Sequence, residues 1–199
     1  MSILLDENSR ALVIGGTGGY GAAQLEWMRR SGTKIVGLVS PGRAHETVGD
    51  LPVFDLMTEA VAATGANCCM LYVPAPGVHD SIVEAADAGL RLVVAAAELV
   101  PVHDTIKATA YARQRSTWVV GPNTAGLISP GLASLGSIPQ DFTKPGSVGL
   151  MSRSGTLSIM TAHILTSAGV GQSTVVSMGG DAIIGQAPVA YLRAFLEDP

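Results

Sequence analysis

A glycine-rich turn between a predicted strand and a predicted helix is the feature that most constrains the fold of this chain. The apolar run 11–14 predicts a buried strand, and residues 22–30 predict a helix that ends near residue 32. Between them, Gly16, Gly18 and Gly21 have the G-x-G-x-x-G spacing of dinucleotide-binding folds. The exposed amides and the positive dipole end at the helix start suit a pyrophosphate. The stretch predicts a phosphate-binding turn, with ordinary turn chemistry as the alternative.

The second predicted strand, residues 34–39, ends in a turn that bears on the choice of nucleotide. An NAD-binding fold usually carries an acidic residue about 20 positions after the glycines, to hold the ribose hydroxyls. This chain has Ser40-Pro41-Gly42-Arg43 instead. We expect Arg43 to meet a phosphate on the ribose, which NADP and coenzyme A both carry at different hydroxyls. A solvated loop arginine is the alternative.

The alternation of apolar runs and helical stretches predicts an α/β fold. Strands are predicted at 51–54, 68–73, 90–96 and 118–121, with helices at 59–63, from Asp80 or Ser81 to 88, and at 104–115. Residues 1–126 therefore predict a Rossmann-like domain with a parallel sheet. Glu98 follows a strand at the carboxyl end, where such sheets bind ligands, and Pro74-Ala75-Pro76 is expected to form a stiff wall there.

A second, smaller α/β unit is predicted after a linker. Residues 127–146 contain prolines and glycines with little periodicity, and we interpret them as a linker that packs over the first domain. Residues 147–199 predict strands at 148–151 and 173–178 and helices at 157–168 and 188–197. This content is too small to complete a doubly wound sheet, so we expect an incomplete flavodoxin-like domain. Ser154, Gly155 and Thr156 at a helix start predict a second anion site.

Composition excludes several classes of function. The net charge is −4 and the chain has three lysines, which argues against nucleic acid as a partner. No apolar run reaches the roughly 18 residues of a membrane span, and the amino terminus lacks the pattern of a signal or transit peptide. The adjacent Cys68 and Cys69 are expected to be reduced core residues, and no metal site is predicted. We expect a cytoplasmic protein, or a mitochondrial matrix protein in a eukaryote.

The ordered motifs resemble those of the alpha subunits of succinyl-CoA synthetase (succinate–CoA ligase) and related ADP- or GDP-forming acyl-CoA synthetases. The resemblance covers essentially the whole chain. It rests on Thr17-Gly18-x-x-Gly21, Ser40-Pro41-Gly42, Leu51-Pro52-Val53-Phe54, Tyr72-Val73-Pro74-Ala75-Pro76, Gly121-Pro122-Asn123, Ser152-Arg153-Ser154-Gly155-Thr156-Leu157 and Gly179-Gly180-Asp181.

The resemblance implies a CoA-binding subunit of a ligase of the tricarboxylic acid cycle. In such an enzyme a beta subunit uses ATP or GTP with Mg²⁺ to phosphorylate a histidine. The phosphoryl group passes to a small carboxylic acid, and the thiol of coenzyme A attacks the acyl phosphate. The implied partner is thus the beta subunit of a hetero-oligomer.

The resemblance also assigns residues to the ligands. Asn123 would lie near the reactive thiol, Ser154, Gly155 and Thr156 would face the phosphate, and Ile159 would lie at the acid. Arg43 stands where such subunits often carry a lysine, which keeps the charge and changes the hydrogen-bond geometry. Succinate-binding members carry a tyrosine just after Ser-Gly-Thr-Leu-x, and this chain has Ile159 there, so the acid is left open. The implied CoA contacts are Thr17, Gly18, Gly19, Tyr20, Pro41, Arg43, Val73, Pro74, Ala96, Ala97, Glu98 and Asn123.

The histidines point to a chain that binds coenzyme A without turnover. The family's phosphohistidine lies later in the second domain, beyond residue 199, and none of His45, His79, His103 and His163 falls in a matching motif. A non-catalytic CoA-binding or regulatory module is therefore one alternative, although it has no need of a second anion site. An NADP-dependent reductase is another, supported by the glycine turn and by Arg43 but lacking an identifiable proton donor.

Overall fold

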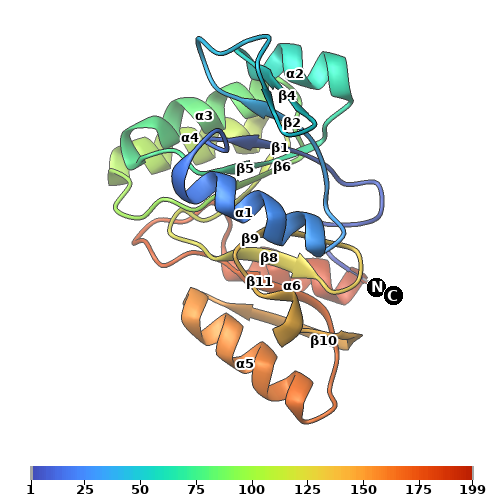
Figure 1. The fold of residues 1–199 in the computed structure, drawn as a ribbon. Helices are drawn as coiled ribbons and strands as arrows, with labels where there is room; N and C mark the ends of the chain where they lie inside the picture. Colours follow the sequence, from blue (N-terminus) through green and yellow to red (C-terminus); the bar gives the residue numbers. More distant parts are fainter. Residues whose placement is uncertain (1, 199) are drawn as a thin grey trace.

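The computed structural model describes residues 2–198, in which the strands form two sheets (Figure 1). In the larger sheet β4, β2, β1, β5, β6 and β7 run parallel in that order, and the short β3 pairs antiparallel with β4 at the edge. This is the Rossmann strand order, so the predicted α/β class is confirmed. The strands are β1 (Arg10–Ile14), β2 (Lys34–Val39), β3 (Thr47–Val48), β4 (Leu51–Phe54), β5 (Cys68–Leu71), β6 (Leu92–Ala95) and β7 (Trp118–Val120).

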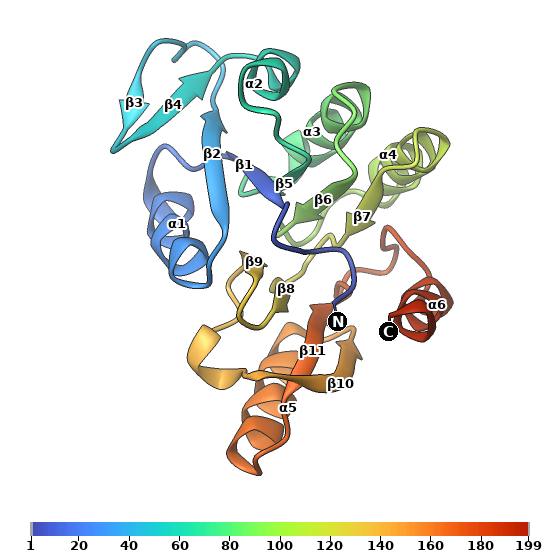
Figure 2. The same ribbon diagram turned by 90° about the vertical axis from the view of Figure 1, so that its right-hand side faces the viewer.

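Apolar cores cover both faces of this sheet, as a parallel sheet requires. Ala11 and Val13 of β1 belong to the core that includes the inner face of α1 (Gly19–Arg30). Leu12 and Ile14 alternate to the opposite core, beneath α2 (Met57–Thr64), α3 (Ala75–Asp87) and α4 (Val102–Gln114). Figure 2 shows these three helices together on one side of the sheet and α1 on the other.

The start of α3 differs from the prediction. We expected a stiff loop at Pro74–Pro76 and a helix from Asp80 or Ser81, whereas the helix begins at Ala75, with Pro74 as its N-cap residue. The first helical turn needs no intrahelical amide donor, and the fixed φ of proline suits it, so prolines there start a helix as readily as they stop a strand.

The second sheet has the order β10-β11-β8-β9 and includes strands inside the predicted linker. Residues 127–146 hold most of an antiparallel hairpin, of β8 (Gly126–Ser129) and β9 (Ala133–Gly136), and the short 3-10 helix η1 (Gln140–Phe142). The hairpin packs against the first sheet, where the Thr33 hydroxyl donates to the carbonyl of Ser134 at 2.6 Å. Its strands are too short for a visible alternation, which is why the sequence did not reveal them.

The rest of the second region follows the predicted order. β10 (Pro145–Ser152) and β11 (Gln172–Ser177) are parallel and joined by α5 (Gly155–Ser167), and β8 pairs antiparallel with β11. The predicted helix 188–197 is confirmed as α6 (Pro188–Glu197). The domain boundaries at 126 and 146 stay a prediction. Met1 and Pro199, the outer ends of the two predicted domains, lie outside the described residues.

Helix α6 returns the chain to the first sheet. Tyr191 is fully buried, and its ring meets the ring of Trp118 on β7 edge-on, with 5.3 Å between the centroids. Burial raises the pKa of Tyr191 to about 12. The two ends of the described residues consequently lie side by side (Figures 1 and 2), and the amide of Ser2 donates to the carboxylate of Asp198 at 2.8 Å.

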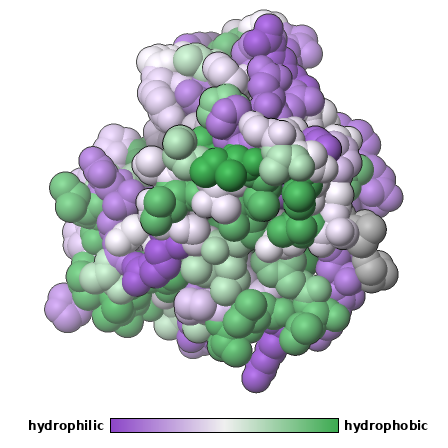
Figure 3. Space-filling model, turned by 90° about the horizontal axis from the view of Figure 1, so that it is seen from below, coloured by the Kyte–Doolittle hydropathy of each residue, from purple (hydrophilic) through white to green (hydrophobic). Residues whose placement is uncertain are grey.

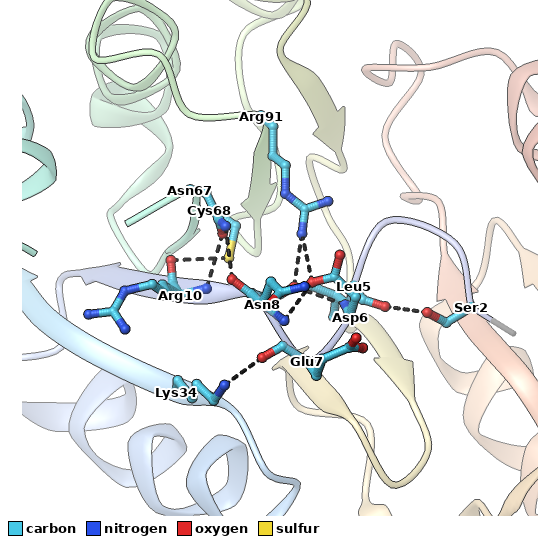
Figure 4. Close-up of polar contacts among 11 residues, drawn as sticks. Ser2, Leu5, Asp6, Glu7, Asn8, Arg10, Lys34, Asn67, Cys68 and Arg91 are labelled. Carbon is cyan, nitrogen blue, oxygen red and sulfur yellow. Dashed lines mark hydrogen bonds and ion pairs between the residues drawn. The ribbon is translucent and has the colours of Figure 1, made fainter. Parts of the chain in front are cut away.

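A polar cluster closes the amino ends of the central strands (Figure 4). Arg91 donates to the hydroxyl of Ser9 at 2.9 Å, Lys34 donates to the carbonyl of Glu7, and Asn67 donates to the carbonyl of Asn8. These contacts tie the segment before β1 to β2 and to the residues that precede β5 and β6. The carboxyl ends of these strands lie at the opposite edge of the sheet.

Two smaller predictions concern the interior and the membrane. Cys68 and Cys69 are buried in opposite cores and are both free thiols, as expected, and burial raises the pKa of Cys68 to about 12. Among residues 2–198, the helices are all too short or too polar to cross a membrane.

Candidate functional site

The glycine turn joins β1 to α1 at the carboxyl edge of the sheet, with the backbones in close contact. A Cβ on Gly21 would lie 2.2 Å from the carbonyl oxygen of Gly15, so only glycine lets α1 approach β1 this closely. Around Gly18 and Gly19, by contrast, an added Cβ would meet no atom within 4 Å. The first turn of α1 carries no acidic side chain, and its first amides have no partner within the helix.

The first cleft, about 340 Å³ in volume, lies beside this turn. Its walls come from α1, from the ends of β5 and β6, from the turn after β7 and from the residue after β9. Five of the predicted CoA contacts therefore meet in one place. The lining residues are Tyr20, Met70, Tyr72, Val73, Ala96, Ala97, Glu98, Thr124 and Ser137.

An aromatic pair shapes this cleft. The rings of Tyr20 and Tyr72 meet edge-on with 5.5 Å between their centroids. Tyr20 is exposed, whereas the hydroxyl of Tyr72 is buried and has no hydrogen-bond partner among the described residues. That burial raises the pKa of the Tyr72 phenol, so it stays protonated and can donate a hydrogen bond.

Arg43 lies in the loop after β2, where an acidic side chain fixes the guanidinium. Its Nε donates to Glu46 at 2.9 Å, and this hydrogen bond raises the pKa of Arg43 and lowers that of Glu46. The backbone amides of Arg43 and Ala44 both donate to the carboxylate of Asp55. Glu46 and Asp55 thus both hold this loop. An arginine has five N–H donors, so Arg43 still has donors for a ligand while it is paired with Glu46.

The second cleft, about 480 Å³ in volume, opens at the start of α5. Ser154 caps this helix, its hydroxyl accepting from the amide of Leu157 at 3.3 Å. No acidic side chain stands in the first turn of α5, so the amides there and the helix dipole favour an anion. The predicted Ser154, Gly155, Thr156 and Ile159 meet in this cleft. The full lining is Asn123, Thr124, Ala125, Arg153, Ser154, Gly155, Thr156, Ile159 and Gly180.

The turn after β7 joins the two clefts. Thr124 lines both of them, and its hydroxyl donates to the carbonyl of Ser177 at the end of β11. Asn123 has a left-handed φ of 56°, its amide donates to the carbonyl of Ala97 at 2.7 Å, and its carbonyl accepts from Gly180 at 2.8 Å. Hydrogen bonds therefore hold the walls of the two clefts together.

Other predicted residues lie around these clefts and do not line them. Thr17, Gly18 and Gly19 form the glycine turn, Pro41 and Arg43 follow β2, and Pro74 precedes α3. These positions follow strands that lie side by side in the sheet, at the same edge. Their proposed contacts with ligand remain predictions.

Sequence reasoning missed seven of the residues that line the clefts: Met70, Tyr72, Thr124, Ala125, Ser137, Arg153 and Gly180. Tyr72, Arg153 and Gly180 belong to the motifs on which the family resemblance rests, so those motifs could have identified them. Arg153 is the informative case, because its guanidinium donates to the carbonyls of Gly179 and Asp181 and so fixes the loop after β11. Ser137 follows β9 within the predicted linker and carried no signal.

The four histidines lie outside both clefts. His163 stacks on Phe142 with 4.3 Å between ring centroids, and His79 contacts Asp80. None of the four histidines lines the first or the second cleft. Within residues 2–198 no group of three or more His, Cys, Asp or Glu side chains could hold a metal ion.

Comparison with known proteins identifies the family. The model of the CoA binding domain matches residues 6–99, which include the glycine turn and most of the first cleft. The ADP-forming succinate–CoA ligase subunit alpha 2 of Archaeoglobus fulgidus is 45% identical over 198 residues, which cover 100% of this chain and 69% of the relative. The chain belongs to the succinate–CoA ligase alpha-subunit family. The subunit alpha of Staphylococcus aureus is 42% identical over 198 residues, 66% of its length. The chain thus spans about two thirds of these curated ligase subunits.

Solved structures give the same assignment of fold. ATP citrate lyase from Methanothrix soehngenii, in complex with citrate and coenzyme A, has a TM-score of 0.85 at 25% identity, covering 99% of this chain and 35% of that one. The apo form of a dinucleotide-forming acetyl-coenzyme A synthetase from Korarchaeum cryptofilum has a TM-score of 0.78 at 21% identity, covering 97% and 43% of the two chains. At this lower identity the likeness shows the fold alone.

Proposed function

We propose that this chain binds coenzyme A in the first cleft and takes part in acid–CoA ligation at the second. The observation that carries this proposal is the junction of the clefts, which share Thr124 and are tied together through Asn123. A ligase must bring a thiol to an activated acid, and placing both in touching clefts supplies the required proximity.

The first cleft suits the parts of coenzyme A. The amides at the start of α1 fit the diphosphate, and the apolar walls at Val73 and Ala96 fit the pantetheine arm. Arg43, held by Glu46, would meet the phosphate on the ribose. The buried hydroxyl of Tyr72 would gain a hydrogen-bond acceptor from the ligand.

The second cleft suits an acid that becomes phosphorylated. The first-turn amides of α5 and the guanidinium of Arg153 would stabilise the negative charge of a phosphoryl group, and Ile159 would contact the carbon chain of the acid. ATP or GTP with Mg²⁺ would be used by the beta subunit, and a phosphohistidine would deliver the phosphoryl group. Because the four histidines lie outside both clefts, this chain by itself is expected to bind without turnover.

An apolar stripe on α5 supports a protein partner. Leu157, Met160 and Ile164 are 61%, 49% and 62% exposed, and their spacing puts them on one face of the helix. Figure 3 shows apolar side chains gathered on the side seen from below, the end at which α5 lies. Exposed apolar patches of this kind mark interaction sites. We assign the stripe to contact with the beta subunit.

The second cleft also separates this proposal from the alternatives. A CoA-binding module without catalysis has no use for an anion site at the start of α5. An NADP-dependent reductase is disfavoured by the identity to ligase alpha subunits along the entire chain.

Calorimetric titration of the purified chain with coenzyme A, dephospho-CoA and NADPH tests the proposal. We expect coenzyme A to bind best and Arg43→Ala to weaken it about tenfold, since a half-exposed charge-assisted hydrogen bond contributes about 1–1.5 kcal/mol. Dephospho-CoA should bind the wild type and the variant equally. Arg30→Ala is the matched control, because Arg30 is an exposed arginine that is also paired with a glutamate.

The outcomes separate the hypotheses. Preference for NADPH would support the reductase and overturn the ligase. An equal loss of coenzyme A and dephospho-CoA affinity in Arg43→Ala would show that Arg43 does not read the ribose phosphate. Absence of all binding would refute CoA binding by this chain.

A further inference from the structure

In the motif Gly179-Gly180-Asp181, the side chain of Asp181 has no part in the function described so far, yet the motif lies where the two clefts meet. It follows β11, and the carboxylate of Asp181 accepts hydrogen bonds from three N–H groups on two other segments. Asn123 Nδ2 donates to Oδ1 at 3.0 Å, the amide of Val100 donates to Oδ2 at 3.2 Å, and the amide of Leu99 donates to Oδ1 at 3.4 Å. The carboxylate therefore holds both the turn after β7 and the loop that carries the wall of the first cleft.

These contacts settle how the Asn123 carboxamide is turned. An ionised carboxylate only accepts hydrogen bonds, so Asn123 must direct its Nδ2, rather than its Oδ1, at Asp181. The backbone of Asn123 is clamped as well, by Ala97 and by Gly180. Among the hydrogen bonds of residues 2–198, none is donated to Asn123 Oδ1. Asn123 thus has a carboxamide oxygen that is an unused acceptor, and the residue lines the second cleft.

We propose that Asp181 is a positioning residue, which holds Asn123 so that its Oδ1 accepts a hydrogen bond from the thiol of bound coenzyme A. This rests on the proposed function, in which the reactive end of the ligand must lie at the junction of the clefts. A neutral amide is too weak a base to take the thiol proton, so Asn123 orients the sulfur without deprotonating it. Asp181 acts through Asn123 and touches no ligand.

The test compares the binding of coenzyme A with that of desulfo-CoA, which lacks the sulfur, by calorimetry on the 199-residue chain. The wild type should bind coenzyme A more tightly than desulfo-CoA. Because a thiol is a weak donor, we expect its hydrogen bond to Asn123 to contribute a factor of about three to this preference. In Asp181→Asn an amide NH₂ group replaces one of the two carboxylate oxygens. This group cannot accept a hydrogen bond from the N–H donors that face it, so the side chain of Asn123 is no longer held in one orientation. That share of the preference should disappear in Asp181→Asn and in Asn123→Ala.

Two controls keep the result interpretable. Asn123→Ala leaves the bonds from Leu99 and Val100 to Asp181 in place, so it reports on the acceptor if Asp181→Asn fails to fold. Asp80→Asn removes a carboxylate whose side chain is 90% exposed and far from this network in the chain, and it should keep the wild-type preference. A purely structural role for Asp181 would lower the thermal midpoint and the affinities for both ligands together, without changing their ratio.

The outcomes distinguish this inference from the proposed function. If the wild type binds coenzyme A and the ratio is unchanged in Asp181→Asn and Asn123→Ala, the positioning role is overturned and CoA binding stands. If the wild type binds neither ligand, CoA binding itself fails and this inference falls with it.

Discussion

Replacing Gly21 by alanine should damage the fold and the proposed phosphate site at the glycine turn together. The added Cβ would lie 2.2 Å from the carbonyl oxygen of Gly15, 3.0 Å from its carbonyl carbon and 3.2 Å from the Cα of Gly16. All three are backbone atoms, so no side chain can rotate away to relieve the contact. α1 would have to move away from β1 by about an ångström to restore an ordinary separation.

The size of the effect follows from that displacement. Overpacking of a core typically costs about 1–3 kcal/mol, and a clash against backbone belongs at the upper end. For a chain of this length, about 3 kcal/mol corresponds to a fall of roughly 6–12 °C in the thermal midpoint. The amides of α1 move with the helix, so the affinity for coenzyme A should fall as well.

Gly18→Ala is the matched control for this prediction. Gly18 has an extended φ of −175° that alanine adopts without strain, and an added Cβ meets nothing within 4 Å. Its thermal midpoint should stay within about 1 °C of the wild type. The methyl group would nevertheless occupy the space above the α1 amides, so we expect about a tenfold loss of CoA affinity.

Differential scanning calorimetry and CoA titration on the two variants give the decisive comparison. An unchanged midpoint for Gly21→Ala would refute the close packing of α1 on β1. Wild-type CoA affinity for Gly18→Ala would refute the placement of the diphosphate over this turn, whatever Gly21→Ala does.

Two further predictions concern stability and the partner surface. Tyr191 has a pKa of about 12, raised by burial from an ordinary value of 10. The stability that its neutral form contributes is therefore complete below about pH 10 and is lost as the pH rises through 12. Denaturant titrations should show the unfolding free energy of the wild type falling by about 2 kcal/mol more than that of Tyr191→Phe between pH 9 and 12, and parallel curves would contradict the buried phenol. The double variant Leu157→Gln, Ile164→Gln should reduce binding of an apolar dye and of the beta subunit while keeping the thermal midpoint, because both side chains are exposed. A large fall in the midpoint would instead place the stripe in the core.

Local patterns in the sequence predicted much of the larger sheet. The glycine turn and the alternation of strands and helices depend on neighbouring residues, so they can be read along the chain. Helix α3 shows where this fails, since Pro74 and Pro76 are compatible with a loop and with the first turn of a helix. The hairpin of β8 and β9 was missed because its short strands gain their stability from packing against α1 and the first sheet.

Short sequence motifs predicted many of the residues that line the two clefts. Ser154, Gly155 and Thr156 meet at the start of α5 as their motif indicates. The buried hydroxyl of Tyr72 could not be predicted, because its burial depends on residues from other elements packed around it. The pairing of Arg43 with Glu46 spans only three positions, but it needs the loop conformation that Asp55 holds.

The sequence by itself determined the glycine turn between β1 and α1, the parallel α/β architecture and the second helix start suited to an anion. Each is a property of backbone conformation within a few residues, where glycine, hydroxyl and apolar side chains have strong local preferences. Only the tertiary structure decided that the two clefts meet at Thr124 and that Asp181 holds Asn123 and Val100. Asn123 and Val100 lie 58 and 81 positions before Asp181 in the chain. The order of the first sheet places the loops after β6 and β7 side by side, and the loop after β11 of the second sheet brings Asp181 to them.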